Sequence, residues 1–277
     1  MMISFKTKMI IAYTVLVLLT FFWMLPFYVA LVTSLKSHEE TYTTNVLQPP
    51  SAANIIPWFI AWGRVSRAFI NSILVSIPAT FLCVLTGTLA GYYLSRFVSK
   101  VNRLLFFLIA IATFIPYQIL LIPMTMFLST VGIMGTHLSF IVAYTILLSP
   151  WATLISAAFF LAIPKELEEA AQIDGASPVQ SFFKIVLPVA LPGIISTTII
   201  IFMSIWNEFL FAVTLSTSPI IRTIQPEVAN LRGTTTVAWN TLMAGSLIAI
   251  LPPLVITLAL GKYFIRGLLA GALKGVR

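Results

Sequence analysis

The sequence is poor in the residues that most often carry enzyme chemistry. It has one cysteine, Cys83, so no disulfide can form within the chain. It has two histidines, His38 and His137, which argues against a metal site built from histidines. Asp174 is the only aspartate among eight acidic residues. A membrane-embedded enzyme usually shows clustered Asp or His for metal or acid–base work, so this class is disfavoured.

Two further absences concern nucleotides and nucleic acids. The sequence has no G-x-x-x-x-G-K-[ST] phosphate-binding loop, so we expect that the chain is not an enzyme and does not hydrolyse ATP. We also expect it to bind no cofactor and no metal of its own. The formal net charge of +8 comes from basic residues scattered near the ends of apolar segments, with no stripe that alternates with aromatic residues. Nucleic acid is therefore not an expected partner.

Apolar residues dominate what is present. Hydrophobic residues make up 59% of the chain, charged residues 9%, and the mean hydropathy is +1.03, far from the averages of soluble proteins. A hydrocarbon core about 30 Å thick requires about 20 apolar residues per helix. The runs lack the polar–apolar alternation of barrel strands. The sequence predicts an all-α membrane protein, a single transmembrane domain over residues 1–277 in the lipid bilayer, with six spans at about residues 10–32, 72–94, 104–127, 138–163, 191–215 and 241–264.

The positions of the basic residues predict the orientation of the spans, because Lys and Arg are retained on the cytoplasmic side. Most of the 16 basic residues fall at the two termini and in the connections after the second and fourth spans. They are Lys6, Lys8, Arg96, Lys100, Arg103, Lys165, Lys184, Lys262, Arg266, Lys274 and Arg277. We therefore expect a multi-pass protein with both termini in the cytoplasm.

Glycines and prolines inside the spans predict where helices pack closely or bend. Gly87 and Gly91 form a G-x-x-x-G pair that permits close helix contact. Pro116 and Pro123 in the third span and Pro150 in the fourth each remove one backbone hydrogen bond and can kink a helix.

The connection at residues 164–188 is the most polar segment, with the sequence PKELEEAAQIDGASPVQSFFKIVLP. Gly175 suits the left-handed turn that ends a helix. Ser177 to Gln180 has the pattern of a capping box with proline at the first helical position. The segment therefore predicts two short helices around a rigid turn. The first would have an apolar face formed by Leu167, Ala170, Ala171 and Ile173.

Two interpretations of this connection are open. It could lie as an amphipathic pair of helices at the lipid interface, or it could bind a soluble protein. Its polar face begins with acidic residues, which anionic cytoplasmic lipid headgroups would repel, so binding of a protein is favoured. The acidic residues are Glu166, Glu168, Glu169 and Asp174.

One pattern in this connection is highly specific. It reads EAA, three residues, G, nine residues, I, one residue and LP, from Glu169 to Pro188. This spacing resembles the EAA loop of the permease subunits of ATP-binding-cassette importers. The segments WNEF at residues 206–209 and GLLAGALKG at 267–275 are similar to those of the maltose-type, MalG-like sugar permeases. The resemblance extends over all six spans.

The resemblance implies a type I ABC importer permease fold and a division of labour between proteins. A coupling helix would dock into cytoplasmic ATP-binding subunits, which would hold ATP and Mg²⁺. A homologous sister permease would complete the membrane part, and an extracytoplasmic solute-binding protein would deliver a sugar across the cytoplasmic (inner) membrane of a prokaryote. The resemblance assigns ATPase coupling to Glu166, Glu169, Ala170, Ala171, Asp174 and Gly175, and a tail contact with the ATPase to Leu273, Lys274 and Gly275.

Polar residues within the spans are candidates for the translocation pathway. Glu208 is the only acid within a predicted span, where a charge costs roughly 2.5–3.5 kcal/mol at mid-bilayer on insertion scales. It could border a cavity, or it could hydrogen-bond a neighbouring helix or the sister permease. Sugar rings offer hydroxyl groups and apolar faces, so the candidates are Tyr117, Gln118, Trp206, Asn207 and Glu208. Helix packing is the alternative role for each.

Other transport functions stay open at this point. The same importer role could serve a polyol or glycerol phosphate instead of a sugar. A secondary carrier is a weaker alternative, since the sequence shows no convincing inverted repeat and only one acid within a span.

Overall fold

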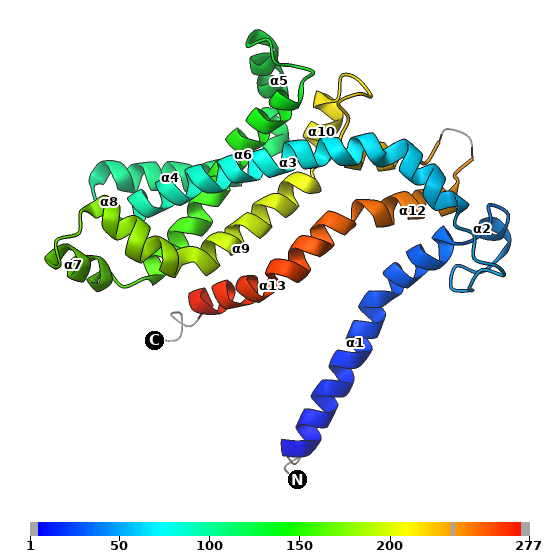
Figure 1. Ribbon diagram of the computed structural model, residues 1–277, viewed down its shortest axis with the longest axis horizontal. Helices are drawn as coiled ribbons and strands as arrows, with labels where there is room; N and C mark the ends of the chain where they lie inside the picture. The colour runs from blue at the N-terminus through cyan, green and yellow to red at the C-terminus, as the bar shows by residue number, and fades with distance from the viewer. Residues whose placement is uncertain (1–4, 234–235, 273–277) are drawn as a thin grey trace. The chain divides into compact units, whose positions relative to one another are not determined.

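The computed structural model describes residues 5–233 and 236–272. Every regular element in these ranges is a helix, and none is a strand (Figure 1). By length and composition five helices could cross a membrane, or six if one bent pair counts as a span. The predicted all-α membrane fold is thus confirmed. The predicted tail residues Leu273, Lys274 and Gly275 lie outside the described residues.

The candidate spans follow the apolar runs of the sequence, but several limits differ, most clearly in the second and fifth spans. α3 begins earlier than the predicted second span, at Ile56, and α9 ends at Trp206, before the predicted limit of the fifth span at Leu215. The candidate spans are α1 (Phe5–Ser34), α3 (Ile56–Arg96), α6 (His137–Ala162), the run of α8 (Pro178–Ser181), η2 (Phe182–Val186) and α9 (Leu187–Trp206), and the run of α12 (Trp239–Ala249) with α13 (Leu251–Ala272).

The third predicted span, residues 104–127, is not one straight helix. α4 (Lys100–Phe114) is followed by the 3₁₀ turn η1 (Tyr117–Leu120) and α5 (Leu121–Thr130), and the two parts are bent by 94°. Pro116 has no N–H to donate, and the residue before it, Ile115, has the extended ψ of 124° that a following proline favours. The proline therefore breaks this span instead of only kinking it.

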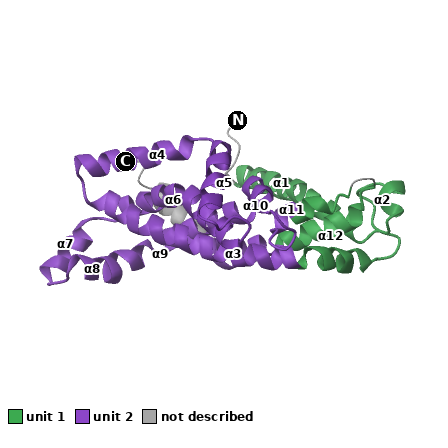
Figure 2. Cartoon of the chain, turned by 90° about the horizontal axis from the view of Figure 1, so that it is seen from above, with its two compact units in different colours: residues 1–66, 227–250 green, residues 67–226, 251–277 purple. Residues whose placement is uncertain are grey.

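The chain divides into two compact units, coloured in Figure 2. Unit 1 contains residues 1–66 and 227–250, and unit 2 contains residues 67–226 and 251–277. The single domain over the whole chain therefore stays a prediction. The short helices are α2 (Glu40–Thr43), α7 (Glu166–Ile173), α10 (Leu210–Leu215) and α11 (Ile224–Asn230).

In unit 1, α1 packs against α12, and a buried lysine closes the end of α1. The Lys36 side chain is buried, and its Nζ donates hydrogen bonds to Thr44 Oγ1 at 2.8 Å and to the carbonyl oxygen of Asn45 at 2.7 Å. The amide of Asn240, at the start of α12, donates to the carbonyl oxygen of Lys36. Neutral oxygen atoms thus solvate this cation, as burial of a charge requires.

In unit 2, α9 packs against α6 and α13, and glycines bring α3 close to α6. A Cβ atom added at Gly87 would lie 2.5 Å from Ala152 Cβ, and one added at Gly91 would lie 2.8 Å from the nitrogen of Ala157. Real side chains do not approach so closely, so only glycine fits at these two positions. The predicted packing role of the G-x-x-x-G pair is confirmed.

Candidate coupling loop and membrane cavity

The first helix of the polar connection, α7, begins with acids and ends at a glycine. Its first turn holds Glu166, Glu168 and Glu169, which suit the positive end of a helix dipole. After α7, Gly175 has φ of +88°. The N–H of Ala176 donates to the carbonyl oxygen of Ala171 at 2.9 Å, and the N–H of Gly175 to that of Gln172 at 3.0 Å. This is a Schellman turn, in which glycine avoids the clash of a Cβ atom.

The second helix begins with the predicted capping box. The Gln180 N–H donates to Ser177 Oγ at 3.3 Å, and the Ser177 N–H donates to Gln180 Oε1 at 2.9 Å, with Pro178 at the first helical position. α8 continues through the π-helical turn η2 into α9. The predicted arrangement of two short helices around a rigid turn is thus confirmed.

The predicted apolar residues of α7 are not buried as a unit. Only Glu168 and Ala171 of α7 are buried, whereas the side chains of Leu167 and Ile173 are 42% and 86% exposed. Val179 and Phe183 beyond the turn are also exposed. We call the exposed residues Glu166, Leu167, Glu169, Ala170, Ile173, Asp174, Val179 and Phe183 the loop surface.

The acids of the loop surface are open to solvent. Among the described residues, the carboxylates of Glu166, Glu169 and Asp174 make no side-chain hydrogen bond and no ion pair. Exposed apolar side chains lie beside these acids, so the loop surface presents charged and apolar groups together.

Glu168 has the opposite environment, and the sequence-based site missed it. It forms a buried ion pair with Arg96, the last residue of α3, and accepts a hydrogen bond of 2.8 Å from Tyr92 Oη. Its spacing placed it beside Ala171 but did not show that this side of α7 is buried. Glu168 lies three residues before Ala171, so the two share one face of α7, and that face is the buried one.

A cavity of about 380 Å³ lies in unit 2, at the break in the third span and the end of α9. Three predicted pathway residues line it together, namely Tyr117, Asn207 and Glu208. The sequence-based site missed other polar and aromatic lining residues, because nothing in an apolar run marks which side faces a cavity. These are Thr113, Tyr144, Trp151, Ser204 and Phe209.

The Glu208 carboxylate accepts three hydrogen bonds within unit 2. Its Oε1 accepts a hydrogen bond from the Phe211 N–H at 3.0 Å, and its Oε2 accepts from the Ala212 N–H at 2.9 Å and from Tyr144 Oη at 3.0 Å. The two backbone donors belong to the first turn of α10, so the carboxylate replaces intrahelical acceptors there. Glu208 therefore borders the cavity and also joins α10 to α6.

The other lining groups keep hydrogen-bonding capacity for a solute. Asn207 is exposed, donates to the carbonyl oxygen of Met203 at 2.9 Å, and accepts from Gln225 Nε2 at a long 3.4 Å. The Tyr117 ring stacks on Phe211, with 6.1 Å between ring centroids.

Two predicted pathway residues do not line this cavity. Gln118 is exposed on η1 and is not among the lining residues. Trp206 is buried, with its ring edge-on to Phe69 and stacked on Phe202, each at 5.7 Å between centroids. Packing is therefore the role that the geometry gives to Trp206.

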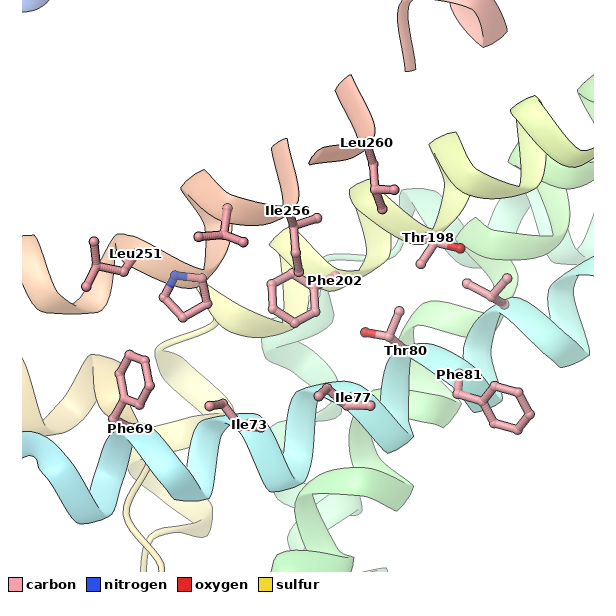
Figure 3. Close-up of a pocket in the computed structure, with 13 residues that line it drawn as sticks. Phe69, Ile73, Ile77, Thr80, Phe81, Thr198, Phe202, Leu251, Ile256 and Leu260 are labelled. Atoms are coloured by element: carbon pink, nitrogen blue, oxygen red, sulfur yellow. The ribbon is translucent and has the colours of Figure 1, made fainter. Parts of the chain in front are cut away.

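A second cavity of about 570 Å³ in unit 2 is almost entirely apolar (Figure 3). Side chains from α3, α9 and α13 surround it, including Ile77, Phe202 and Ile256. Thr80 and Thr198 supply its only hydroxyl groups. It offers few groups to orient a polar solute, so the smaller cavity is the better candidate.

Comparison with known proteins identifies the group to which the chain is similar. The family described as "Binding-protein-dependent transport system inner membrane component" matches residues 83–269, which include the loop and the cavity. The chain is 33% identical over 273 residues to the glucose import system permease protein GlcU of Saccharolobus solfataricus, covering 95% of both. It is 33% identical to the melibiose/raffinose/stachyose import permease protein MelC of Bacillus subtilis, covering 91% of both.

Solved structures share the fold. A chain of a bacterial ABC transporter involved in the import of the acidic polysaccharide alginate superposes with a TM-score of 0.78 at 18% identity, covering 95% of this chain and 100% of that one.

Proposed function

Because the chain belongs to the family of binding-protein-dependent transport system inner membrane components, we propose that it carries a neutral sugar across the cytoplasmic membrane of a prokaryote as one permease of an ATP-binding-cassette importer. Members of this family are transport permeases rather than enzymes, which supports assigning ATP hydrolysis, with its ATP and Mg²⁺, to a separate subunit. The observation that carries the proposal is the match over residues 83–269, which holds both the loop surface and the cavity.

The loop surface is the proposed docking site for the ATP-binding subunits. Its acids have no partner within the described part of the chain, and Ile173 is 86% exposed at the turn. An exposed charge and an exposed apolar side chain both gain from a protein partner that supplies a cation and a cleft. The Gly175 turn and the Ser177 capping box fix the surface in one shape, so little ordering would be needed on docking.

The smaller cavity is the proposed part of the translocation pathway. Its volume of about 380 Å³ lies within the ordinary range of ligand sites, about 300–1,000 Å³. No Lys or Arg lines it, and its one carboxylate is already bonded, so an uncharged solute fits better than glycerol phosphate. The Tyr117 and Trp151 rings offer faces for a sugar ring, and Asn207 and Ser204 offer hydrogen bonds. The names of GlcU and MelC support sugars as the class.

The remaining partners follow from the same proposal. A homologous sister permease would supply the opposite wall of the pathway, and an extracytoplasmic binding protein would deliver the sugar. The distribution of Lys and Arg supports placing both termini and the loop surface on the cytoplasmic side.

The test is to purify the chain from its native membranes in mild detergent, identify accompanying proteins by mass spectrometry and assay ATP hydrolysis. We expect a second permease and an ATP-hydrolysing subunit in the eluate. Reconstituted vesicles with the binding protein should accumulate glucose or a raffinose-type oligosaccharide only with ATP. A chain that purifies alone, or vesicles that take up glycerol 3-phosphate but no sugar, would overturn the importer proposal or the sugar assignment respectively.

A further inference from the structure

The buried contact between α3 and α7 is unlike the loop surface next to it. Arg96 and Glu168 form an ion pair with side chains that are only 6% and 10% exposed. Tyr92, one turn before Arg96 on α3, donates its hydroxyl to the other carboxylate oxygen of Glu168. Arg96 Nη2 also donates to the carbonyl oxygen of Ile163, just after α6, at 3.1 Å. Three elements therefore meet at one guanidinium group.

Both charges sit at the helix ends that favour them. Arg96 occupies the last turn of α3, where the backbone carbonyls carry partial negative charge, and Glu168 occupies the first turn of α7, where the N–H groups carry partial positive charge. In a buried site the ion pair is screened little by salt. Separating the two helix ends would leave two buried charges without partners, which is strongly unfavourable.

Aromatic packing makes the same joint rigid on its inner side. The Tyr92 ring contacts Phe182 of η2 at 4.4 Å and Phe160 of α6 at 5.4 Å between centroids. Phe160, Phe182 and Val186 belong to one buried apolar cluster against which Tyr92 packs. Tyr92 thus belongs to the polar contact with α7 and to the apolar contact with η2, and it holds both ends of the loop to α3.

We propose that Arg96, Glu168 and Tyr92 form a mechanical joint that transmits displacement of α7 into α3. This proposal rests on the proposed function, since it requires that a partner moves α7. Glu168 is a positioning residue here: it touches neither solute nor nucleotide. Acids on the two sides of α7 then have different tasks, with Glu169 facing the partner and Glu168 fixing the helix to the span.

The test measures solute taken up per ATP hydrolysed in reconstituted complexes of the full chain with its partners. We expect Glu168→Gln and Arg96→Gln to retain the ATP-binding subunit during purification but to lower uptake per ATP about fivefold or more, a coupling loss of ordinary size. The double variant Arg96→Glu with Glu168→Arg restores opposite charges and should recover part of the ratio. Glu39→Gln and Arg103→Gln serve as matched controls and should leave the ratio unchanged, because both positions are exposed and neither side chain has a hydrogen-bond or ion-pair partner among the described residues.

Tyr92→Phe provides a milder change if the charged variants do not assemble. It removes only the hydroxyl that donates to Glu168 and keeps the aromatic packing, so we expect normal assembly and a smaller fall in uptake per ATP. An unchanged ratio in Glu168→Gln, or in Tyr92→Phe where Glu168→Gln is not recovered, overturns the joint. A wild-type complex with no ATP-binding subunit or no ATP-driven uptake overturns the proposed function instead, so the two failures are distinguishable.

Discussion

The exposed acids of the loop surface and the acid of the cavity are used in opposite ways. Glu166, Glu169 and Asp174 are exposed, and within the described residues their carboxylates bond to nothing. Glu208 has three donors around its carboxylate, two backbone N–H groups and Tyr144 Oη. The carboxylates of the loop surface are open to solvent, whereas the Glu208 carboxylate is already hydrogen-bonded within the chain.

This difference separates residues that bind another molecule from residues that shape a site. A carboxylate with free lone pairs can pair with a cation of a partner protein. Where a carboxylate already accepts three hydrogen bonds, the protein loses stability if a solute displaces the donors. We therefore expect substitutions at the loop to alter coupling between proteins. At Glu208 we expect them to alter the structure around the cavity. The predictions below test this contrast, beginning with the largest effect.

Replacing Gly175 by valine should have the largest effect. Its φ of +88° is strained for any residue with a Cβ atom and most of all for a branched one, at a cost of roughly 1–3 kcal/mol. The turn should open and shift α8 relative to α7, so ATP-driven uptake should fall about tenfold or more. Uptake and recovery of the chain in membranes are measured together.

Gly261→Val is the matched control for this variant. A Cβ atom at either glycine meets no atom within 4 Å, but only Gly175 has positive φ. Normal uptake by Gly175→Val, or equal losses in both variants, would remove the turn from the coupling mechanism.

Replacing Glu208 by alanine should mainly lower stability. The change leaves two N–H groups of α10 and the buried hydroxyl of Tyr144 without their acceptor, which costs about 1–3 kcal/mol. Glu208→Gln keeps one acceptor oxygen and should lose less. Thermal unfolding of the purified complex measures both, and Glu227 is not a suitable control because it has contacts of its own. If both variants unfold like the wild type but fail in uptake, Glu208 acts on the solute and the contrast is lost.

Replacing Asn207 by alanine should have a smaller effect, directed at the solute. Asn207 is exposed in the cavity and bonded only to the Met203 carbonyl and, weakly, to Gln225. Loss of one neutral hydrogen bond to a sugar of about 0.5–1.5 kcal/mol should raise the half-saturating sugar concentration by a few fold without lowering thermal stability. Gln118→Ala is the control, since Gln118 does not line the cavity. Equal effects of both variants would mean that the translocation pathway does not pass through this cavity.

The sequence was sufficient to predict the helices and the turn of the loop. It was insufficient to predict which side of each helix is buried. Gly175, Ser177 and Gln180 determine turns through local backbone chemistry, so their geometry could be predicted. Burial of Glu168 depends on Arg96, which is far away in the chain, and local periodicity instead suggested an apolar face containing the exposed Ile173. Position along the helix was predictable, whereas the choice of buried side was made by tertiary contacts.

The cavity illustrates the same limit. Glu208 was a strong candidate because an acid in an apolar span must have a partner. That partner, Tyr144, lies on another helix in an apolar run with no distinguishing pattern. Pro116 predicted a bend but not its size, because the 94° angle also depends on how α5 packs. Trp206 carried the resemblance yet lies in aromatic packing, since a motif does not specify which way a side chain points.

Glu40 should show the smallest effect, and it extends the contrast because its carboxylate, like that of Glu208, accepts hydrogen bonds from backbone N–H groups. Its carboxylate accepts hydrogen bonds from Ser51 and from the Ser37 N–H, which lower its pKa from 4.5 to about 2. A lowered pKa stabilises the folded state above pH 4.5, and this contribution is lost as the pH falls from about 4.5 to about 2.

Wild type should therefore lose stability relative to Glu40→Gln within this window, measured by thermal unfolding against pH. Because the group is solvent-accessible, the difference at neutral pH should be small. Glu39→Gln controls for the loss of one charge in the same segment, because the Glu39 side chain makes no hydrogen bond within the described residues. A gap between wild type and Glu40→Gln that stays constant from pH 7 to pH 2 would mean that the two serine contacts do not favour the ionised carboxylate. The contrast between bonded and open carboxylates would then not extend to Glu40.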